Sequence, residues 1–317
     1  MTSSSGAEDP LPASDDAKGR GTPTQWLVID VQIDEGQLRD HVVMELFDAG
    51  ATAVEELPEG VRTAFPDTGD GRRKRDEALE VLGQLLGDSG GIAGPVAERI
   101  VPHEVWEESW RHGLGPRQVS ERILVRPTWS DPVPLSEGVH ELVLDPGVAF
   151  GTAEHATTRG ALRLLDALCR PGQKLLDLGS GSAILSIAAA LLGARTVVAV
   201  DFDPFATGAA LENIARNGVG EVVTVKEAML TPSGVVALGP VDGIMANIQS
   251  GILTELLPGI AEALRPGGWV ILSGILRIEA SRMQARAEQA GLSLEAEDGE
   301  DEWWSAVFRK SMEPSSR

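Results

Sequence analysis

The sequence is poor in cysteine, in long hydrophobic runs and in positive charge, and each shortage excludes a class of protein. The single cysteine, Cys169, cannot form an internal disulfide and fits a reducing compartment. The longest apolar run, residues 184–194, is too short to span a bilayer. Apart from Met1, residues 1–24 contain one large apolar residue, Leu11, and so lack the apolar core of a signal peptide. We therefore expect a cytoplasmic protein with no membrane partner.

The charge balance is strongly acidic. The chain has 27 lysines and arginines against 48 aspartates and glutamates, a formal net charge of −21. Nucleic acid is disfavoured as the main partner, because phosphate binding needs clustered cations. A basic protein partner suits this charge through electrostatic steering, and the alternative is that the charge serves solubility alone. We also expect no metal site.

The length allows two domains with a sizeable core. The chain has 317 residues, of which 42% are hydrophobic and 24% are charged, as in globular proteins. Shifts in composition and periodicity divide it into five segments. We expect a disordered tail at residues 1–24, a substrate-recognition domain at 25–101, a linker at 102–135, a catalytic domain at 136–310 and a short tail at 311–317.

Residues 25–101 alternate between strand and helix patterns in the order β-α-β-β-α-β, which is typical of a small ferredoxin-like α+β domain. This domain carries no obvious catalytic residue, so we expect it to serve recognition. The predicted strands are residues 26–33, 51–57, 61–65 and 94–101, and the predicted helices are residues 38–47 and 72–86.

The linker is rich in tryptophan and proline. Trp106 and Trp110 are four residues apart, so they share one face of a predicted helix, and Trp129 follows. Packing between the domains is favoured over stacking on a substrate for these rings. A connection is marked by Pro127, Pro132 and Pro134.

The most informative pattern lies in the second half, where an apolar strand is followed by a glycine turn and a helix. The segment LLDLGSGSA places Gly179 and Gly181 where they let the backbone turn sharply and approach a ligand. Asp201 ends the next apolar strand and can accept hydrogen bonds from ribose hydroxyls. A dinucleotide fingerprint requires a third glycine where Ile184 stands. The pattern therefore favours an adenosine-type cofactor and disfavours NAD.

The elements around this turn indicate a parallel α/β sheet that closes with a hairpin. Pro204 begins a helix that Asn217 and Gly218 end. The acidic turn EDGEDE separates the last two strands. A parallel sheet closed in this way is typical of Rossmann-like S-adenosylmethionine-dependent methyltransferases. Further strands are predicted at residues 241–246, 269–273, 292–296 and 303–308, and a helix at 277–290.

Two other places supply candidate site residues. The loop at residues 144–158 is expected over the carboxyl ends of the strands, where ligands bind. Thr157 or Thr158 either caps the helix after this loop or contacts the cofactor. Asn247 ends the fourth strand, and its amide oxygen can accept a hydrogen bond from an amine nucleophile and aim it at a methyl group. The alternative for Asn247 is a cap for the helix beginning near Ser250.

Three residues beside these have structural alternatives. His155 either shapes the pocket or moves a proton, or else is held in a structural hydrogen bond. Asp203 is interpreted as a helix start together with Pro204 rather than as a second cofactor ligand. Cys169 is interpreted as a core residue.

Several longer segments together resemble the ribosomal protein L11 methyltransferase family. They cover nearly all of residues 26–310. The glycine turn alone is shared by many methyltransferases, whereas the loop before it and the Asn-Ile of the fourth strand are much more specific. The segments are DPGVAFGTAEHATT, DLGSGSAILSIAA, VAVDFDP, ENIARNGV, MANIQSGIL, RPGGWVILSGIL and EDEWWSAVFRK, with WLVIDVQIDEGQLRDHVVMELFDAGATAVEEL and VWEESWRHGL before them.

The resemblance implies a class I S-adenosylmethionine-dependent methyltransferase with a seven-stranded, mostly parallel sheet, preceded by the recognition domain. It also implies trimethylation of lysine side chains and of the N-terminal amine of ribosomal protein L11, a basic protein. S-Adenosyl-L-methionine is the implied cofactor. Its implied contacts are Thr158, Gly179, Asp201 and Asn247, with Gly181 in the same turn, and Asn247 is also the candidate for positioning the substrate amine.

The chain departs from the family pattern at five positions, Ala153, Glu154, Ala156, Ala183 and Gln249. Ala153 and Ala183 stand where glycine is usual, and an alanine there strains the loop unless its φ is negative. Glu154 is expected to hold the cationic substrate. Substrate identity is therefore open. The alternatives are a methyltransferase of another protein or of a small molecule, and a cofactor-binding module that has lost catalysis.

Overall fold

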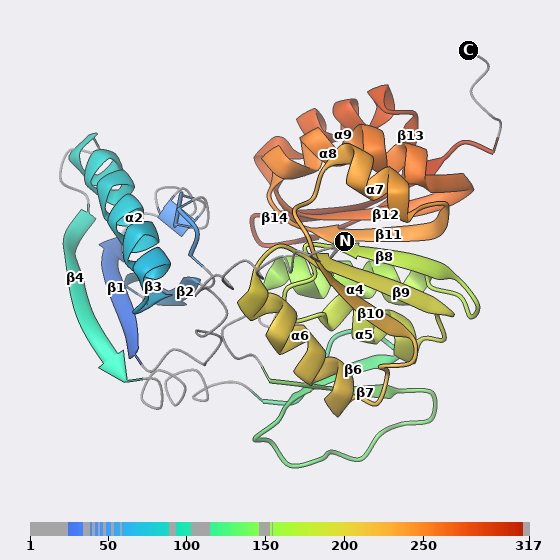
Figure 1. Ribbon diagram of the computed structural model, residues 1–317, viewed down its shortest axis with the longest axis horizontal. Coiled ribbons are helices and arrows are strands. Elements are labelled where there is room, and N and C mark those ends of the chain that lie inside the picture. Colours follow the sequence, from blue (N-terminus) through green and yellow to red (C-terminus); the bar gives the residue numbers. More distant parts are fainter. Residues whose placement is uncertain are drawn as a thin grey trace, which may run out of the picture. The chain divides into compact units, whose positions relative to one another are not determined.

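The computed structural model describes residues 25–33, 39, 42–43, 45–46, 49–51, 54–57, 59–88, 93–102, 115–145, 153 and 155–312. The chain falls into two compact units, Met1–Trp106 and Glu107–Arg317 (Figure 1). The predicted tail at residues 1–24 and three residues singled out in the sequence, Trp106, Trp110 and Glu154, lie outside the described residues.

The first unit contains a four-stranded antiparallel sheet in the order β2-β3-β1-β4, with helix α2 (Gly69–Asp88) across one face (Figure 1). Alternate residues of β1, from Leu27 to Ile33, pack with Ala78 and Leu82 of α2 in one core. This strand order is that of the predicted ferredoxin-like α+β domain. The strands are β1 (Gln25–Ile33), β2 (Val54–Leu57), β3 (Gly60–Pro66) and β4 (Ala93–Pro102).

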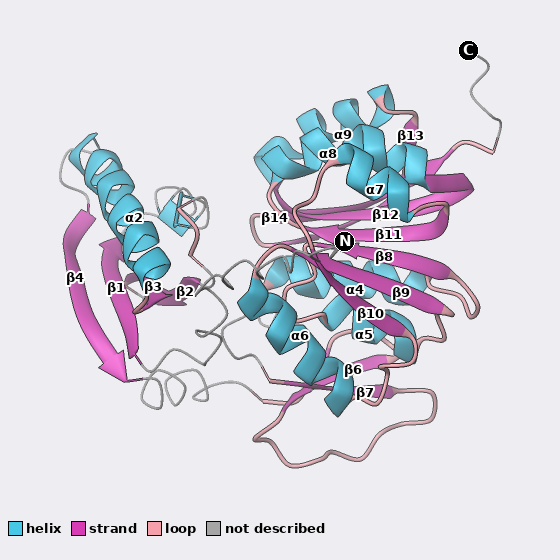
Figure 2. Cartoon of the chain, in the orientation of Figure 1, coloured by secondary structure: helices cyan, strands magenta, loops and turns pink. Residues whose placement is uncertain are grey.

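The second unit is built on seven strands in the order β10-β9-β8-β11-β12-β14-β13 (Figure 2). The first five in this order run parallel, and β14 runs antiparallel to both of its neighbours. The sheet is therefore the predicted parallel sheet closed by a hairpin, and the class I methyltransferase fold is confirmed. Its strands are β8 (Lys174–Leu178), β9 (Thr196–Asp201), β10 (Val223–Glu227), β11 (Val241–Asn247), β12 (Leu264–Leu276), β13 (Leu292–Glu300) and β14 (Trp303–Lys310).

Helices cover both faces of this sheet, and each face has its own core (Figure 2). Leu175 of β8 packs in the core on the side of α4 and α5, whereas Leu176 packs in the core on the side of α8. Central parallel strands are apolar throughout because both of their faces are buried. No helix in the described part of the chain is long and apolar enough to cross a membrane. The helices are α4 (Ala156–Leu168), α5 (Ile184–Leu191), α6 (Pro204–Arg216), α7 (Pro232–Leu238), α8 (Ser250–Ala263) and α9 (Ala280–Gln289), the last preceded by the 3₁₀ turn η2 (Arg277–Glu279).

The segment expected to be a linker, residues 102–135, contributes two strands to the second unit. Here β5 (Arg117–Gln118) and β6 (Ile123–Pro127) form a three-stranded sheet with β7 (His140–Leu144). Every residue of β6 is buried, and this strand shares its core with α4 and α5. The sequence indicated only a connection here, because a five-residue strand that is buried throughout shows no alternation.

Candidate functional site

The predicted site residues of three strands meet at one edge of the seven-stranded sheet. Leu178 of β8 pairs with Val200 of β9 and with Ala246 of β11. The residues that follow these three are Gly179, Asp201 and Asn247. Because parallel strands in register end at the same level, the glycine turn, the carboxylate and the amide lie side by side at the carboxyl edge.

The glycine turn has the left-handed backbone that its sequence predicts. Gly179 has φ 71° and Gly181 has φ 50°. A Cβ on Gly179 would overlap the side chain of Ile248, which follows Asn247. The close approach at Gly179 is therefore made by the side chain of Ile248, directly after β11, and this contact helps to fix where Asn247 lies.

Ala183 is strained. It has φ 64° and ψ 22°, and it stands at the N-cap of α5 without making a side-chain capping bond. Left-handed backbone costs a residue with a Cβ roughly 1–2 kcal/mol. Alanine here does not adopt the negative φ that would avoid strain, so the strain lies in the turn itself.

The Asp201 carboxylate ties the turn to the strand beside it. Its Oδ2 accepts a hydrogen bond from the Gly181 amide at 2.9 Å, and its Oδ1 accepts one from the Asp203 amide at 3.1 Å. A carboxylate has about four acceptor positions, so about two remain for ribose hydroxyls. Burial raises the pKa of Asp201 above its usual range. Phe202, the next residue, is 58% exposed and offers an apolar face at the same edge.

Asn247 and Thr158 form a buried pair. The Asn247 amide nitrogen Nδ2 donates to the Thr158 hydroxyl at 3.3 Å. The Asn247 amide oxygen Oδ1 is buried and, within the described part of the chain, has no hydrogen-bond partner. Buried polar atoms are rarely left without a partner, because each costs about 1–3 kcal/mol. An unfilled acceptor at the ligand-binding edge therefore points to a donor on a ligand.

The structural alternatives for Asn247 and the two threonines are wrong. The N-cap of α8 is Gln249, not Asn247. The N-cap of α4 is His155, whose Nδ1 accepts a weak hydrogen bond from the Thr157 amide at 3.4 Å. Both threonines lie inside the first turn of α4 and are buried. The Thr158 hydroxyl therefore does not cap the helix, and it accepts the hydrogen bond from Asn247 instead.

His155 has the structural role that was one of its alternatives. Its ring packs edge-on against Trp303, with the ring centroids 4.9 Å apart. Burial and the nearby Arg159 lower the pKa of His155 to about 4. The imidazole is therefore neutral at neutral pH and a weak base. Arg159 in turn donates to the Ala153 carbonyl at 3.1 Å, so the end of the loop is held on α4.

Two further predictions are confirmed. Asp203 caps α6 by accepting from the Phe205 amide at 2.8 Å, and Pro204 is the first helical residue. Cys169 is buried at the end of α4, and burial raises the pKa of its thiol to about 11.

Two polar groups at or next to the turn were not predicted from the sequence. Asp177, the penultimate residue of β8, accepts from both the amide and the hydroxyl of Ser186, at 3.1 Å and 2.6 Å. Its burial raises its pKa to about 7, helped by the charge of Asp201. The Ser180 hydroxyl is buried with no partner among the described residues. A carboxylate inside the apolar segment LLDL was the available signal for Asp177.

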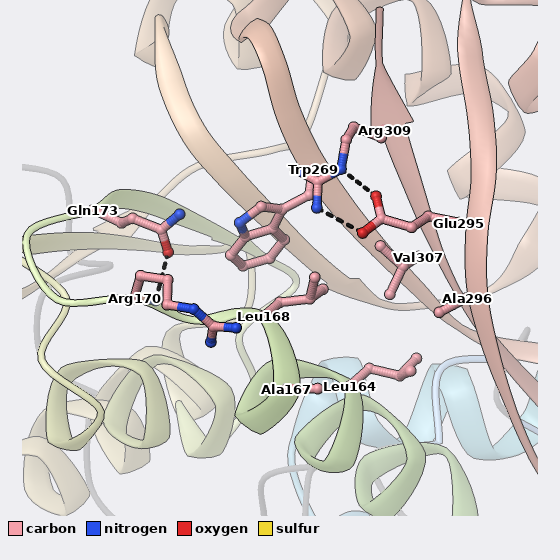
Figure 3. A pocket seen from close by; sticks show the side chains of 10 residues that line it. All are labelled: Leu164, Ala167, Leu168, Arg170, Gln173, Trp269, Glu295, Ala296, Val307 and Arg309. Atoms are coloured by element: carbon pink, nitrogen blue, oxygen red, sulfur yellow. Dashed lines mark hydrogen bonds and ion pairs between the residues drawn. The ribbon is translucent and has the colours of Figure 1, made fainter.

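A cavity of about 460 Å³ lies elsewhere, between the end of α4 and strands β12 to β14 (Figure 3). Arg170 and Gln173 precede β8, so the cavity opens at the amino edge of the strands. Its wall includes Leu168, Trp269 and the Arg309–Glu295 ion pair. None of the predicted site residues lines it. Among the described residues, no group of three or more histidines, cysteines and carboxylates is placed to hold a metal.

Comparison with known proteins identifies the family. Residues 72–311 match the family model described as Ribosomal protein L11 methyltransferase (PrmA). The chain belongs to the ribosomal protein L11 methyltransferase family. The resemblance expected from the loop and from the Asn-Ile segment is thereby confirmed.

Individual members of the ribosomal protein L11 methyltransferase family are similar in sequence to this chain over most of their length. One from Pelotomaculum thermopropionicum is 38% identical over 271 residues, which are 82% of this chain and 86% of that protein. One from Symbiobacterium thermophilum is 39% identical over 224 residues, 71% of each. The crystal structure of a ribosomal protein L11 methylase from Lactobacillus delbrueckii subsp. bulgaricus superposes with a TM-score of 0.55 at 30% identity, covering 62% of this chain and all of that one.

Proposed function

We propose that this chain transfers methyl groups from S-adenosyl-L-methionine to amines of ribosomal protein L11, namely lysine side chains and the N-terminal amine. The names of its relatives support the substrate. The observation that carries the proposal is the Asn247 Oδ1 atom, a buried acceptor with no partner in the described structure at the edge where Gly179 and Asp201 end.

The residues at this edge fit the proposed cofactor. The left-handed turn at Gly179 and Gly181 follows β8 at this edge. Asp201 keeps about two acceptor positions for a ribose, and the Ser180 hydroxyl is buried without a partner among the described residues. Exposed Phe202 suits the flat face of an adenine. When bound, S-adenosylmethionine supplies an activated methyl group on a sulfonium.

Asn247 has two roles in this proposal, contact with the cofactor and positioning of the substrate amine. Its Nδ2 bond to Thr158 fixes the amide plane, so that Oδ1 presents its lone pairs in one direction. An amine that donates to Oδ1 has its own lone pair oriented by that bond. Methyl transfer is an in-line displacement that is accelerated mainly by such positioning.

The substrate amine must be neutral before it attacks. Neutralising a lysine of pKa near 10.4 at pH 7 costs roughly 4–5 kcal/mol, whereas an α-amine of pKa near 7.8 costs about 1 kcal/mol. Asn247 and Thr158 are neutral and buried, and such surroundings favour the uncharged amine. His155 is too weak a base to take the proton, because its pKa is about 4. Proton loss to solvent before the amine is enclosed accounts for the step without a catalytic base.

Three remaining parts of the proposal rest on the sequence. Residues 25–101 serve to recognise the substrate protein, and the net charge of −21 attracts a basic one. Glu154 assists capture of the cation. The reaction takes place in the cytoplasm.

Mass spectrometry of ribosomal protein L11 after incubation with the chain and isotope-labelled S-adenosylmethionine tests the function. We expect added methyl groups on lysines and on the N-terminal amine, and only about one-hundredth as many when Asn247→Ala replaces the wild-type chain over the same time. An unmodified ribosomal protein L11, with another protein or small molecule labelled instead, would contradict the proposed substrate. No labelled product of any kind would contradict methyl transfer itself.

A further inference from the structure

Asn213 of helix α6 and Asn217, the C-cap of this helix, stand one turn apart and bond to the edge of β7 and its continuation. Asn217 exchanges two hydrogen bonds with Val143: its Oδ1 accepts from the Val143 amide at 2.8 Å, and its Nδ2 donates to the Val143 carbonyl at 2.7 Å. Asn213 repeats this with Asp145. Its Oδ1 accepts from the Asp145 amide at 3.0 Å, and its Nδ2 donates to the Asp145 carbonyl at 3.3 Å.

The spacing of the two pairs explains the arrangement. Residues i and i+4 of a helix are about 6 Å apart along its axis. Residues i and i+2 of a strand are about 6.6 Å apart, and their backbone groups point to the same side. The two side-chain amides of α6 therefore take the place of two peptide groups of a neighbouring strand. They satisfy an edge of β7 that no strand of the described chain covers.

Asn213 also makes a contact with the glycine turn, which Asn217 lacks. Its Nδ2 also donates to the carbonyl of Ser182, in the glycine turn, at 3.2 Å. Asn213 is 1% exposed, and Arg216 donates to its Oδ1 at 2.7 Å. The additional bond of Asn217 goes only to the Asn213 carbonyl, within α6. Asn213 alone of the two joins the end of β7 to the glycine turn.

The glycine turn is linked to α6 in two ways, directly through Asn213 and indirectly through Asp201. Gly181, just before Ser182, donates its amide to Asp201. Asp203, the N-cap of α6, donates its own amide to the other oxygen of Asp201. Any rotation of the turn relative to Asp201 must therefore stretch either the Gly181 bond or the Asn213 bond to Ser182.

We propose that Asn213 is a positioning residue of the cofactor site, setting the glycine turn relative to Asp201 without touching the cofactor. This rests on the proposed function, in that the turn is taken to bind S-adenosylmethionine. Loss of the Asn213 bonds removes one restraint on the Ser182 carbonyl, so that the turn, with its Gly181 amide, can shift relative to Asp201. Cofactor affinity then falls, whereas the chemistry at Asn247 does not change.

Asn217→Ala is the matched control, because it removes the same kind of amide pair from the same edge and leaves Ser182 untouched. We expect both Asn213→Ala and Asn217→Ala to lower the melting temperature. In calorimetric titration with S-adenosylhomocysteine, Asn213→Ala should bind about tenfold more weakly, the loss of roughly one hydrogen bond, and Asn217→Ala within about twofold of wild type. Steady-state kinetics should show a raised KM for the cofactor with an unchanged kcat at saturation in Asn213→Ala.

A second variant keeps the test sharp if Asn213→Ala does not fold. Asn213→Asp keeps the acceptor for the Asp145 amide and for Arg216 but cannot donate to Ser182, so it should show the same weakened binding. Equal affinities of the Asn213 and Asn217 variants for S-adenosylhomocysteine would overturn the positioning role while leaving the proposed function intact. No binding by the wild-type chain would overturn both.

Discussion

Asn247 and Thr158 are 89 residues apart in the chain, and their hydrogen bond decides which end of the Asn247 amide faces the carboxyl edge of the sheet. The nitrogen is engaged at 3.3 Å, so the oxygen is the free end. An amide held in this way selects a donor, such as an amine, over an acceptor. The pair therefore predicts that the site receives a hydrogen-bond donor.

Replacing Asn247 by alanine removes the acceptor that positions the amine. We expect kcat to fall about 10²-fold, the cost typical of a misplaced reacting group. The free energy of unfolding should change little, because removal of the unpartnered Oδ1 atom offsets the loss of the Nδ2 bond to Thr158. Single-turnover methylation and thermal unfolding measure the two quantities. Thr158→Val, which keeps the shape and removes the hydroxyl, is the control, and its kcat should fall less than that of Asn247→Ala. Wild-type turnover in Asn247→Ala would exclude the positioning role.

Asp201 carries a prediction on cofactor affinity and its pH dependence. Asp201→Ala should weaken S-adenosylmethionine binding by about 1–3 kcal/mol through the loss of charge-assisted ribose contacts. Because burial raises the pKa of Asp201, wild-type affinity should fall on acidification at a higher pH than for an ordinary aspartate. Calorimetry across pH measures both effects, and Asp201→Asn is the control in which the acid-dependent part should vanish. Identical affinity in wild type and Asp201→Ala contradicts the assignment.

Ala183 offers a test of backbone strain. Ala183→Gly relieves roughly 1–2 kcal/mol of left-handed strain and loses about 0.4–1 kcal/mol through the greater freedom of glycine in the unfolded chain. We expect a net gain in the free energy of unfolding of about 0.5–1 kcal/mol. Ala183→Val, which places a branched side chain at φ 64° in a fully buried position, should destabilise the chain instead. Urea denaturation distinguishes these outcomes, and a destabilised Ala183→Gly would show that the turn is not strained.

Asp177 predicts a pH-dependent stability. Its pKa is raised by burial from 3.8 to about 7. A carboxyl that holds its proton more tightly in the folded state stabilises the fold fully below the pKa of the unfolded chain. That contribution is lost as the pH rises through about 7, and it amounts to about 4 kcal/mol at most.

Asp177→Asn removes this titration and keeps an oxygen for the Ser186 hydroxyl. We expect the stability of the wild-type chain to decline between about pH 4 and pH 7 more steeply than that of Asp177→Asn. Denaturation curves at several pH values give the comparison. Parallel pH profiles in the two proteins would show that Asp177 is ionised as in an ordinary aspartate.

Much of the site follows from short sequence patterns because a parallel sheet converts chain order into proximity. Gly179 follows an apolar strand, Asp201 and Asn247 each end one, and strands in register bring their ends to one level. No pattern could give the Thr158 bond, since it joins groups far apart in the chain whose orientation depends on side-chain packing.

The errors have similar causes. Thr157 and Thr158 were candidate caps by residue type, yet His155 takes that position with its ring nitrogen. Strand β6 was interpreted as part of a linker because all of its residues are buried between β5 and β7, so its sequence shows no alternation of apolar and polar residues. The amide pairs of Asn213 and Asn217 depend on the match between a helical turn and a strand repeat, which neither segment reveals alone.

The decisive experiment is a crystal structure of the chain with S-adenosylhomocysteine. We expect the ligand against the turn of Gly179 and Gly181, its ribose hydroxyls on the Asp201 carboxylate, and Asn247 Oδ1 facing the open position next to the sulfur. A ligand bound elsewhere, for example in the cavity beside Trp269, or one that leaves Asp201 untouched, would contradict it.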